Sequence, residues 1–185
     1  TQGYSSAASD VYKRQFYSDG AFCQFTQDAY TVGVGEALST STFKAGTSAG
    51  MGGESPALEA VKDLKVAVYD ANWNKLADVT GDGTYTYTFD KAGTYYLMGA
   101  DTNAKTSTAH YAPATAKVTV IGNDESGAYT LNTAAEMVWF QKYVSNGHPD
   151  AKAVLGADIN LTGTQWSAIR DFTGTFDGAG HTVTV

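Results

Sequence analysis

An alternating stretch from Asp82 to Ala100 is the feature that most constrains the fold of this chain. Three aromatic residues alternate with three threonines between Thr84 and Phe89. A period of two, built from residues that favour strands, predicts a strand whose aromatic side faces a core and whose threonines face solvent. A corner at residues 90–93 follows, and residues 94–98 begin a second strand. Burial of one large apolar side chain is worth roughly 1.5–3 kcal/mol, so this strand face can anchor a small core.

The charge of the chain argues against two classes of partner. Its 185 residues include 19 acidic and 12 basic side chains, which gives a formal net charge of −7. Nucleic acid needs a basic surface, and anionic lipid repels an acidic one. No apolar run approaches the ~20 residues that cross a bilayer. We therefore expect no nucleic-acid partner, no membrane insertion within this sequence and, without a recognisable cofactor motif, no cofactor.

Cysteine and histidine give no sign of a reactive or metal site. Cys23 is the single cysteine, so an internal disulfide is impossible. It lies in the apolar segment 22–25, and we predict a small buried residue and not a nucleophile. His110, His148 and His181 are far apart in the sequence and show no spacing typical of zinc ligands.

Residues 16–121 carry about seven short strand patterns, with turn residues roughly every ten positions. This spacing predicts an antiparallel β-sandwich. Ser55 and Pro56 have the chemistry of a helix start, which predicts one or two helical turns over residues 57–62. The strand candidates are residues 22–25, 30–34, 64–69, 76–80, 84–89, 94–98 and 116–121.

Three segments of this region resemble the immunoglobulin-like domains of bacterial surface proteins. They are Asp82–Phe89, Ala92–Tyr95, and Pro113 with the closing run Lys117–Val120. The resemblance implies that Tyr95 is a corner tyrosine whose hydroxyl bonds to the main chain. The sequence differs from antibody domains because it has no cysteine pair, and because Trp73 falls in a predicted turn.

The first fifteen residues are set apart from the rest. Residues 5–15 resemble a peptide that recurs in translated metagenome assemblies, where it arises from sequencing adapter read in frame. We therefore predict that residues 1–15 are an artefact or disordered, and exclude them from the fold. The alternative interpretation is a genuine polar leader.

The period changes after a polar linker at residues 122–128. Thr133 and Glu136 form the pattern of a capping box, in which each side chain satisfies a free backbone N–H of the other. Met137, Phe140 and Val144 then share one face at helical spacing, which predicts a helix with a buried side. Gly147 and Pro149 are typical of a helix end.

Residues 131–185 resemble the opening of right-handed β-helices in bacterial surface proteins, including those with GLUG repeats. The resemblance rests on the helix, on Asp158–Leu161, on Trp166 and on the end 174–185, and it departs at Ala168 and Arg170. Residues 129–185 are thus expected to form a capping helix and the first coil or coils of a β-helix. Because about three coils are needed for a stable solenoid, we expect the chain to be a fragment.

Two groups of residues are candidate binding sites. Asp158, Asn160 and Asp177 carry oxygen ligands of the kind that bind calcium, although we favour the interpretation that they cap turns. Trp73, Tyr69 and Tyr111 carry rings that stack on sugars when exposed, although we favour partly buried packing. We assign no catalytic residue.

The predicted fold is mainly β: an immunoglobulin-like sandwich, a capping helix and the start of a β-helix. Two functions remain open. The first is a non-catalytic spacer or adhesion segment of an exported bacterial surface protein, with host or environmental glycans or proteins as partners. The second is an accessory region of a secreted polysaccharide-acting enzyme or peptidase whose active site lies beyond residue 185.

Overall fold

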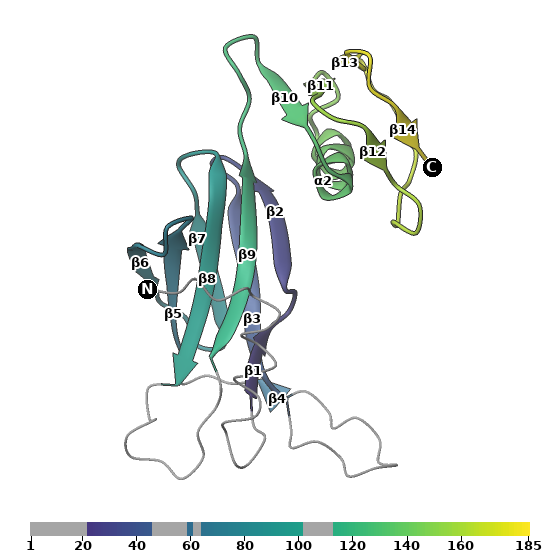
Figure 1. The fold of residues 1–185 in the computed structure, drawn as a ribbon. Helices are drawn as coiled ribbons and strands as arrows, with labels where there is room; N and C mark the ends of the chain where they lie inside the picture. Colours follow the sequence, from purple (N-terminus) through teal and green to yellow (C-terminus); the bar gives the residue numbers. More distant parts are fainter. Residues whose placement is uncertain (1–21, 46–58, 61–63, 102–112) are drawn as a thin grey trace, which may run out of the picture. The chain divides into compact units, whose positions relative to one another are not determined.

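The computed structural model of the chain describes residues 22–45, 59–60, 64–101 and 113–185. The described chain is mainly β, with several sheets and one helix (Figure 1). Its elements in order are β1 (Phe22–Phe25), β2 (Ala29–Gly33), β3 (Ala37–Ala45), β4 (Glu59–Ala60), β5 (Leu64–Asp70), β6 (Lys75–Val79), β7 (Thr84–Thr88), β8 (Gly93–Asp101), β9 (Ala114–Ile121), β10 (Ala128–Leu131), α2 (Ala134–Ser145), β11 (Lys152–Leu155), β12 (Ile159–Asn160), β13 (Thr175–Asp177) and β14 (Val183–Thr184).

The residues cluster into two compact units. Among the described residues, unit 1 comprises residues 22–30, 37–45, 59–60, 64–88, 94–101 and 113–118, and unit 2 comprises residues 31–36, 89–93 and 119–185. Unit 2 is therefore assembled from one long segment and two short ones that come much earlier in the chain. In the part of the chain that the structure describes, no helix has the length and apolar character to span a membrane.

Two sheets contain the first nine strands. The smaller sheet is built on β3, which pairs antiparallel with β1, β4 and β7. The larger sheet has the order β2-β9-β8-β5-β6, and β5 is antiparallel to both of its neighbours. β2 runs parallel to β9, because Asp28 accepts from the N–H of Lys117 and Val34 donates to the carbonyl of Ile121.

The alternation predicted for residues 84–89 is confirmed, although Tyr87 is only half-buried. Tyr85 and Phe89 are each only 2% exposed, whereas the three threonines between Thr84 and Thr88 are exposed. β7 pairs with β3, and the hydroxyl of Tyr85 donates to the carbonyl of Leu64 on β5 at 3.0 Å. This buried bond joins a strand of the smaller sheet to a strand of the larger one. Cys23 is buried, as predicted.

The helix predicted over residues 57–62 is wrong where the structure describes it. Glu59–Ala60 forms β4, a two-residue strand paired with Phe43 and Lys44 of β3. The neighbouring strand provides backbone partners for these residues, and this non-local pairing overrides the weak local preference for a helix. The remaining residues of the predicted helix, the predicted artefact 1–15, and Tyr111 lie outside the described residues.

In unit 2 the predicted helix is confirmed as α2. The backbone N–H of Glu136 donates to Thr133 Oγ1 at 3.2 Å, and Glu136 Oε2 accepts from the backbone N–H of Thr133 at 3.1 Å, so both halves of the capping box are present. Met137, Phe140 and Val144 are buried on one side. The helix ends at Ser145, and Gly147 follows with a positive φ of 106°.

Parallel strands pack beside α2 in unit 2 (Figure 1). β10, β11 and β13 pair parallel and in register, so that Tyr129, Ala153 and Phe176 lie in one row. β12 and β14 form a second parallel pair. Phe140 and Leu131 are completely buried between the helix and these strands. Half-buried side chains at Trp166, Ile169 and Phe172 complete this core.

Candidate functional site

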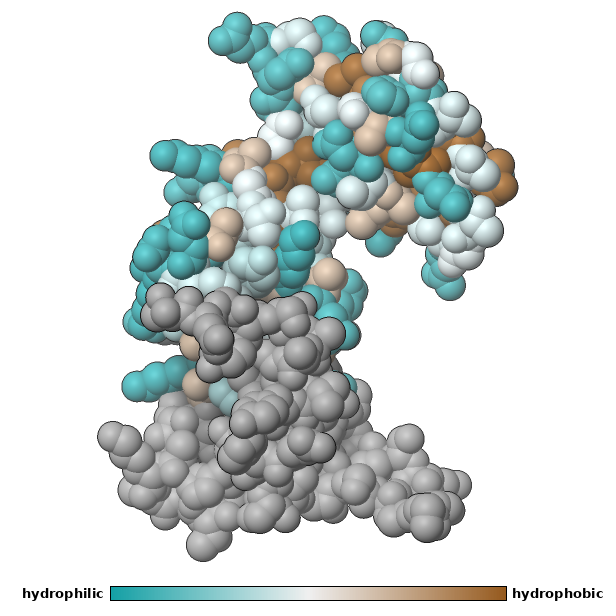
Figure 2. All heavy atoms as spheres, in the orientation of Figure 1, coloured by the Kyte–Doolittle hydropathy of each residue, from teal (hydrophilic) through white to brown (hydrophobic). Residues whose placement is uncertain are grey.

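Exposed large hydrophobic side chains are the first places to look for a binding surface. Figure 2 shows hydrophobic residues, in brown, that reach the surface of unit 2 around β14. The largest exposed hydrophobic side chain among the described residues is that of Trp73 in unit 1, which is 51% exposed.

Trp73 is held in the turn between β5 and β6 by the carboxylate of Asp70. Asp70 Oδ1 accepts from the backbone N–H groups of Asn72, at 2.8 Å, and Asn74, at 2.9 Å. Its Oδ2 accepts from the side-chain amide of Asn74 at 2.9 Å, and its carbonyl accepts from the N–H of Trp73 at 3.0 Å. The turn that the sequence predicts here is therefore a dense network of hydrogen bonds around one side chain.

The same network lowers the pKa of Asp70. The hydrogen bond from the Asn74 side chain is the largest of the effects that lower the pKa of Asp70 below its usual value of 3.8, followed by the backbone N–H of Asn74. Burial acts in the opposite direction but does not prevail. The turn is thus tied together by a charged acceptor at neutral pH.

Three rings form what we call the aromatic platform: Tyr69, Trp73 and Tyr96. Tyr69 on β5 and Tyr96 on β8 are directly opposite in the antiparallel register and so share one face of the sheet. The indole of Trp73 stacks on Tyr96, with ring centroids 4.5 Å apart and planes at 11°. Its centroid lies 5.8 Å from that of Tyr69, with planes at 48°.

The sequence analysis favours partly buried packing for Tyr69 and Trp73; Tyr69 is half-buried, as expected, whereas Trp73 is 51% exposed. The structure brings together two of the three candidate stacking residues, Trp73 and Tyr69, and adds Tyr96, which the sequence interpretation missed. The signal for Tyr96 is its position opposite Tyr69, and that depends on the strand register, which the residues of one strand do not reveal.

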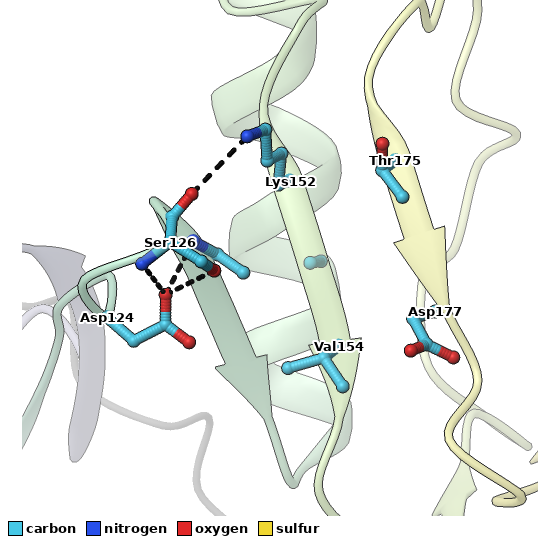
Figure 3. A pocket seen from close by; sticks show the side chains of 8 residues that line it. Asp124, Ser126, Lys152, Val154, Thr175 and Asp177 are labelled. Carbon is cyan, nitrogen blue, oxygen red and sulfur yellow. Dashed lines mark hydrogen bonds between the residues drawn. The ribbon is translucent and has the colours of Figure 1, made fainter.

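A shallow groove in unit 2 is the second candidate (Figure 3). It runs across the outer face of β10, β11 and β13. Its labelled lining residues in Figure 3 are Asp124, Ser126, Lys152, Val154, Thr175 and Asp177.

The charged groups of this groove are engaged with their surroundings. Asp124 Oδ1 accepts from the hydroxyl and the N–H of Ser126 and from the N–H of Ala128, at 2.6, 2.8 and 3.0 Å. The hydroxyl bond is the largest of the effects that lower the pKa of Asp124. Lys152 Nζ donates to the carbonyl of Ser126 at 3.3 Å. These contacts stabilise the turn before β10 and bring no acid and base together for a reaction.

The three candidate calcium ligands each bond to a nearby backbone N–H. Asp158 Oδ1 accepts from Thr182 at 2.8 Å, Asn160 Oδ1 from Thr162 at 2.9 Å, and Asp177 Oδ1 from Ala179 at 2.8 Å. The bond from Thr182 is the largest cause of the lowered pKa of Asp158, whose carboxylate also lies 3.4 Å from the imidazole of His181. Within the described ranges, no three histidine, cysteine, aspartate or glutamate side chains gather as a metal site would require.

Compared with models of known protein families and with curated proteins, the sequence matches none of them.

Proposed function

We propose that the chain is a non-catalytic segment of an exported bacterial cell-surface protein, where it acts as a structural spacer and adhesion module. In this proposal unit 1 belongs to an immunoglobulin-like sandwich, and the segment from residue 129 onward is the capping helix and first coils of a right-handed β-helix. Both assignments start from the resemblance of the sequence to domains of bacterial surface proteins.

The two sheets of residues 22–121 support the first assignment. Each sheet is built from short strands, and along residues 84–89 the buried Tyr85 and Phe89 and the half-buried Tyr87 alternate with exposed threonines. A bond between Tyr85 and Leu64 connects the sheets across their core. The immunoglobulin-like sandwich has this kind of construction.

The observation that carries the second assignment is the in-register parallel stacking in unit 2. A solenoid forms when each turn of chain places one strand directly on the equivalent strand of the previous turn. β10, β11 and β13 do this, and β12 and β14 repeat it on a second side. α2 covers the hydrophobic residues at one side of these strands, as a cap must.

A non-catalytic role is supported by the structural hydrogen bonds that several described aspartate side chains make to the backbone. Asp70, Asp124, Asp158 and Asp177 all accept hydrogen bonds from backbone N–H groups close to them. Asp70, Asp124 and Asp177 each hold a local turn, whereas Asp158 bonds to Thr182, 24 residues away and just before β14. The exposed indole of Trp73 with its two neighbouring tyrosines suits adhesion better than reaction chemistry.

Sequencing of the complete gene would test this proposal. Further Gly-x-Phe-x-Gly repeats followed by a wall-anchoring segment are the expected result. A cluster of acidic, basic or zinc-binding residues on a later coil would overturn it in favour of an accessory region of a secreted polysaccharide-acting enzyme or peptidase. Protease treatment of intact cells would test the location independently, because an exported surface segment is cleaved without cell lysis.

A further inference from the structure

We propose that the aromatic platform of Tyr69, Trp73 and Tyr96 is a carbohydrate-binding site, on which the flat face of a neutral pyranose ring stacks against the indole of Trp73. This inference rests on the proposed adhesive function and names the class of ligand for it. All three residues belong to unit 1.

The backbone of Trp73 provides the first argument. Its φ is +63°, in the left-handed region that glycine and asparagine adopt readily and bulky residues avoid. Its neighbours Asn72 and Asn74 are of a residue type that adopts a positive φ readily, yet the positive φ falls on the tryptophan between them. Conformational strain of this kind persists where the surrounding structure enforces it, and it concentrates at ligand-binding positions.

The rigidity of the platform provides the second argument. Asp70 fixes the turn through hydrogen bonds to residues 72 and 74, and the parallel stack on Tyr96 fixes the indole plane. A binding surface that is ordered before the ligand arrives loses little conformational entropy on binding. The sheet positions of Tyr69 and Tyr96 support the indole from beneath, while half of Trp73 stays exposed.

The shape and charge of the platform select among possible ligands. The near-parallel stack presents one flat surface, whereas a quaternary ammonium ion is bound by rings that surround it. The formal net charge of −7 disfavours stacked nucleic-acid bases, because their phosphates would be repelled. A neutral pyranose fits both observations, since its C–H face is apolar and the exposed side chain of Asn72 lies next to Trp73 with an amide group for its hydroxyls.

The experiment uses the full chain and an immobilised panel of neutral polysaccharides: a β-glucan, a mannan and a galactan. Binding is measured by retention on each polymer and by isothermal titration with the corresponding oligosaccharides. The expected result is binding to at least one polymer, which W73G weakens by about tenfold or more. Glycine suits a φ of +63°, so W73G removes the ring and relieves the backbone strain, and it should fold at least as well as the parent chain.

A matched control separates stacking from general apolar contact. Leu76 is 50% exposed and lies three residues beyond Trp73, and L76A removes exposed apolar surface while leaving all three rings of the platform in place. L76A should bind as the parent chain does, and Y96A should bind more weakly because the indole loses its support. The proposal is overturned if no polymer of the panel binds, if W73G binds as the parent does, or if L76A weakens binding as much as W73G. Selective binding of tetramethylammonium in place of sugars would also overturn it. None of these results bears on a wall-anchoring segment in the gene, so the site and the proposed function can fail separately.

Discussion

The carboxylate of Glu36 accepts a hydrogen bond from the indole Nε1 of Trp139 at 2.9 Å, although 103 residues separate them in the sequence. Both belong to unit 2. The same oxygen of Glu36 accepts from the backbone N–H of Gly33 at 2.7 Å. Trp139 is only 6% exposed, and the missing side chain of Gly33 makes room for its ring, because a Cβ there would lie 2.9 Å from Trp139 Cζ2.

Removal of the Glu36 acceptor should destabilise unit 2. E36A leaves the N–H of Trp139 buried without this acceptor, which we expect to lower the free energy of unfolding by about 1–3 kcal/mol. E36Q is the matched control, because its amide oxygen can still accept and most of the stability should remain. Urea unfolding followed by tryptophan fluorescence measures the difference. Equal stability of E36A and the parent chain would contradict the prediction.

Y85F should destabilise the two-sheet core. The substitution removes the hydroxyl that donates to the carbonyl of Leu64 at 3.0 Å, inside a region where Tyr85 is 2% exposed. We expect a loss of about 1 kcal/mol, the net worth of one such hydrogen bond. The sequence resemblance assigns the corner role to Tyr95, and Y95F is therefore the informative comparison. A larger loss in Y95F than in Y85F, measured by urea unfolding, would support the assignment from the resemblance.

G174A should disrupt the coil of unit 2, whereas G178A should not. A Cβ on Gly174 would collide with the carbonyl oxygen of Ala151, which is backbone and cannot swing aside. Gly178 has only an ordinary contact, at 3.8 Å from the carbonyl oxygen of His181. We expect G174A to cost about 1–3 kcal/mol by overpacking, and G178A to stay within about 0.5 kcal/mol of the parent. Thermal unfolding by circular dichroism would show a lower melting temperature for G174A alone; equal melting temperatures would refute this assignment.

The turn before β10 should depend on pH through Asp124. Its pKa lies below the usual 3.8 in the folded chain because of the Ser126 hydroxyl and the Ala128 N–H. A lowered folded pKa means that the carboxylate stabilises the fold above pH 3.8 and that this contribution is lost as the pH falls through the folded pKa. Carboxyl carbon NMR should give a midpoint below 3.8 for Asp124 in the native chain and near 3.8 in urea. A native midpoint at or above 3.8 would rule out this role.

Local periodicity and capping chemistry could be predicted from the sequence. The alternation from Thr84 to Phe89 marks a buried strand face, and Thr133 with Glu136 marks the start of α2. The capping box succeeds because its two residues lie three positions apart, and the alternation succeeds because the direction of side chains along a strand depends on the local backbone alone. The helix predicted over residues 57–62 fails for the opposite reason, since its central residues find backbone partners on β3, fifteen or more positions away.

In the candidate site, too, the local features could be predicted from the sequence and the non-local contacts could not. A turn at Asp70–Asn74 could be predicted from the residue types, and Trp73 and Tyr69 could be named as candidate stacking residues. The place of Tyr96 under the indole follows only from the pairing of β5 with β8. The bond between Glu36 and Trp139 could not be predicted from the sequence either, because no sequence pattern connects a glutamate after a turn with a helix tryptophan 103 residues away.

The discontinuous composition of unit 2 has a consequence for how such proteins exchange parts during evolution. A recombination event near residue 119 would carry Trp139 into a new gene but leave Glu36 and Gly33 behind. The transferred segment would then meet whatever residues the recipient has in its own β2–β3 turn. A transfer should therefore succeed where the recipient already carries a hydrogen-bond acceptor and a small residue in that turn. Comparison of many such genes should then show that these two residues occur together with the helix tryptophan.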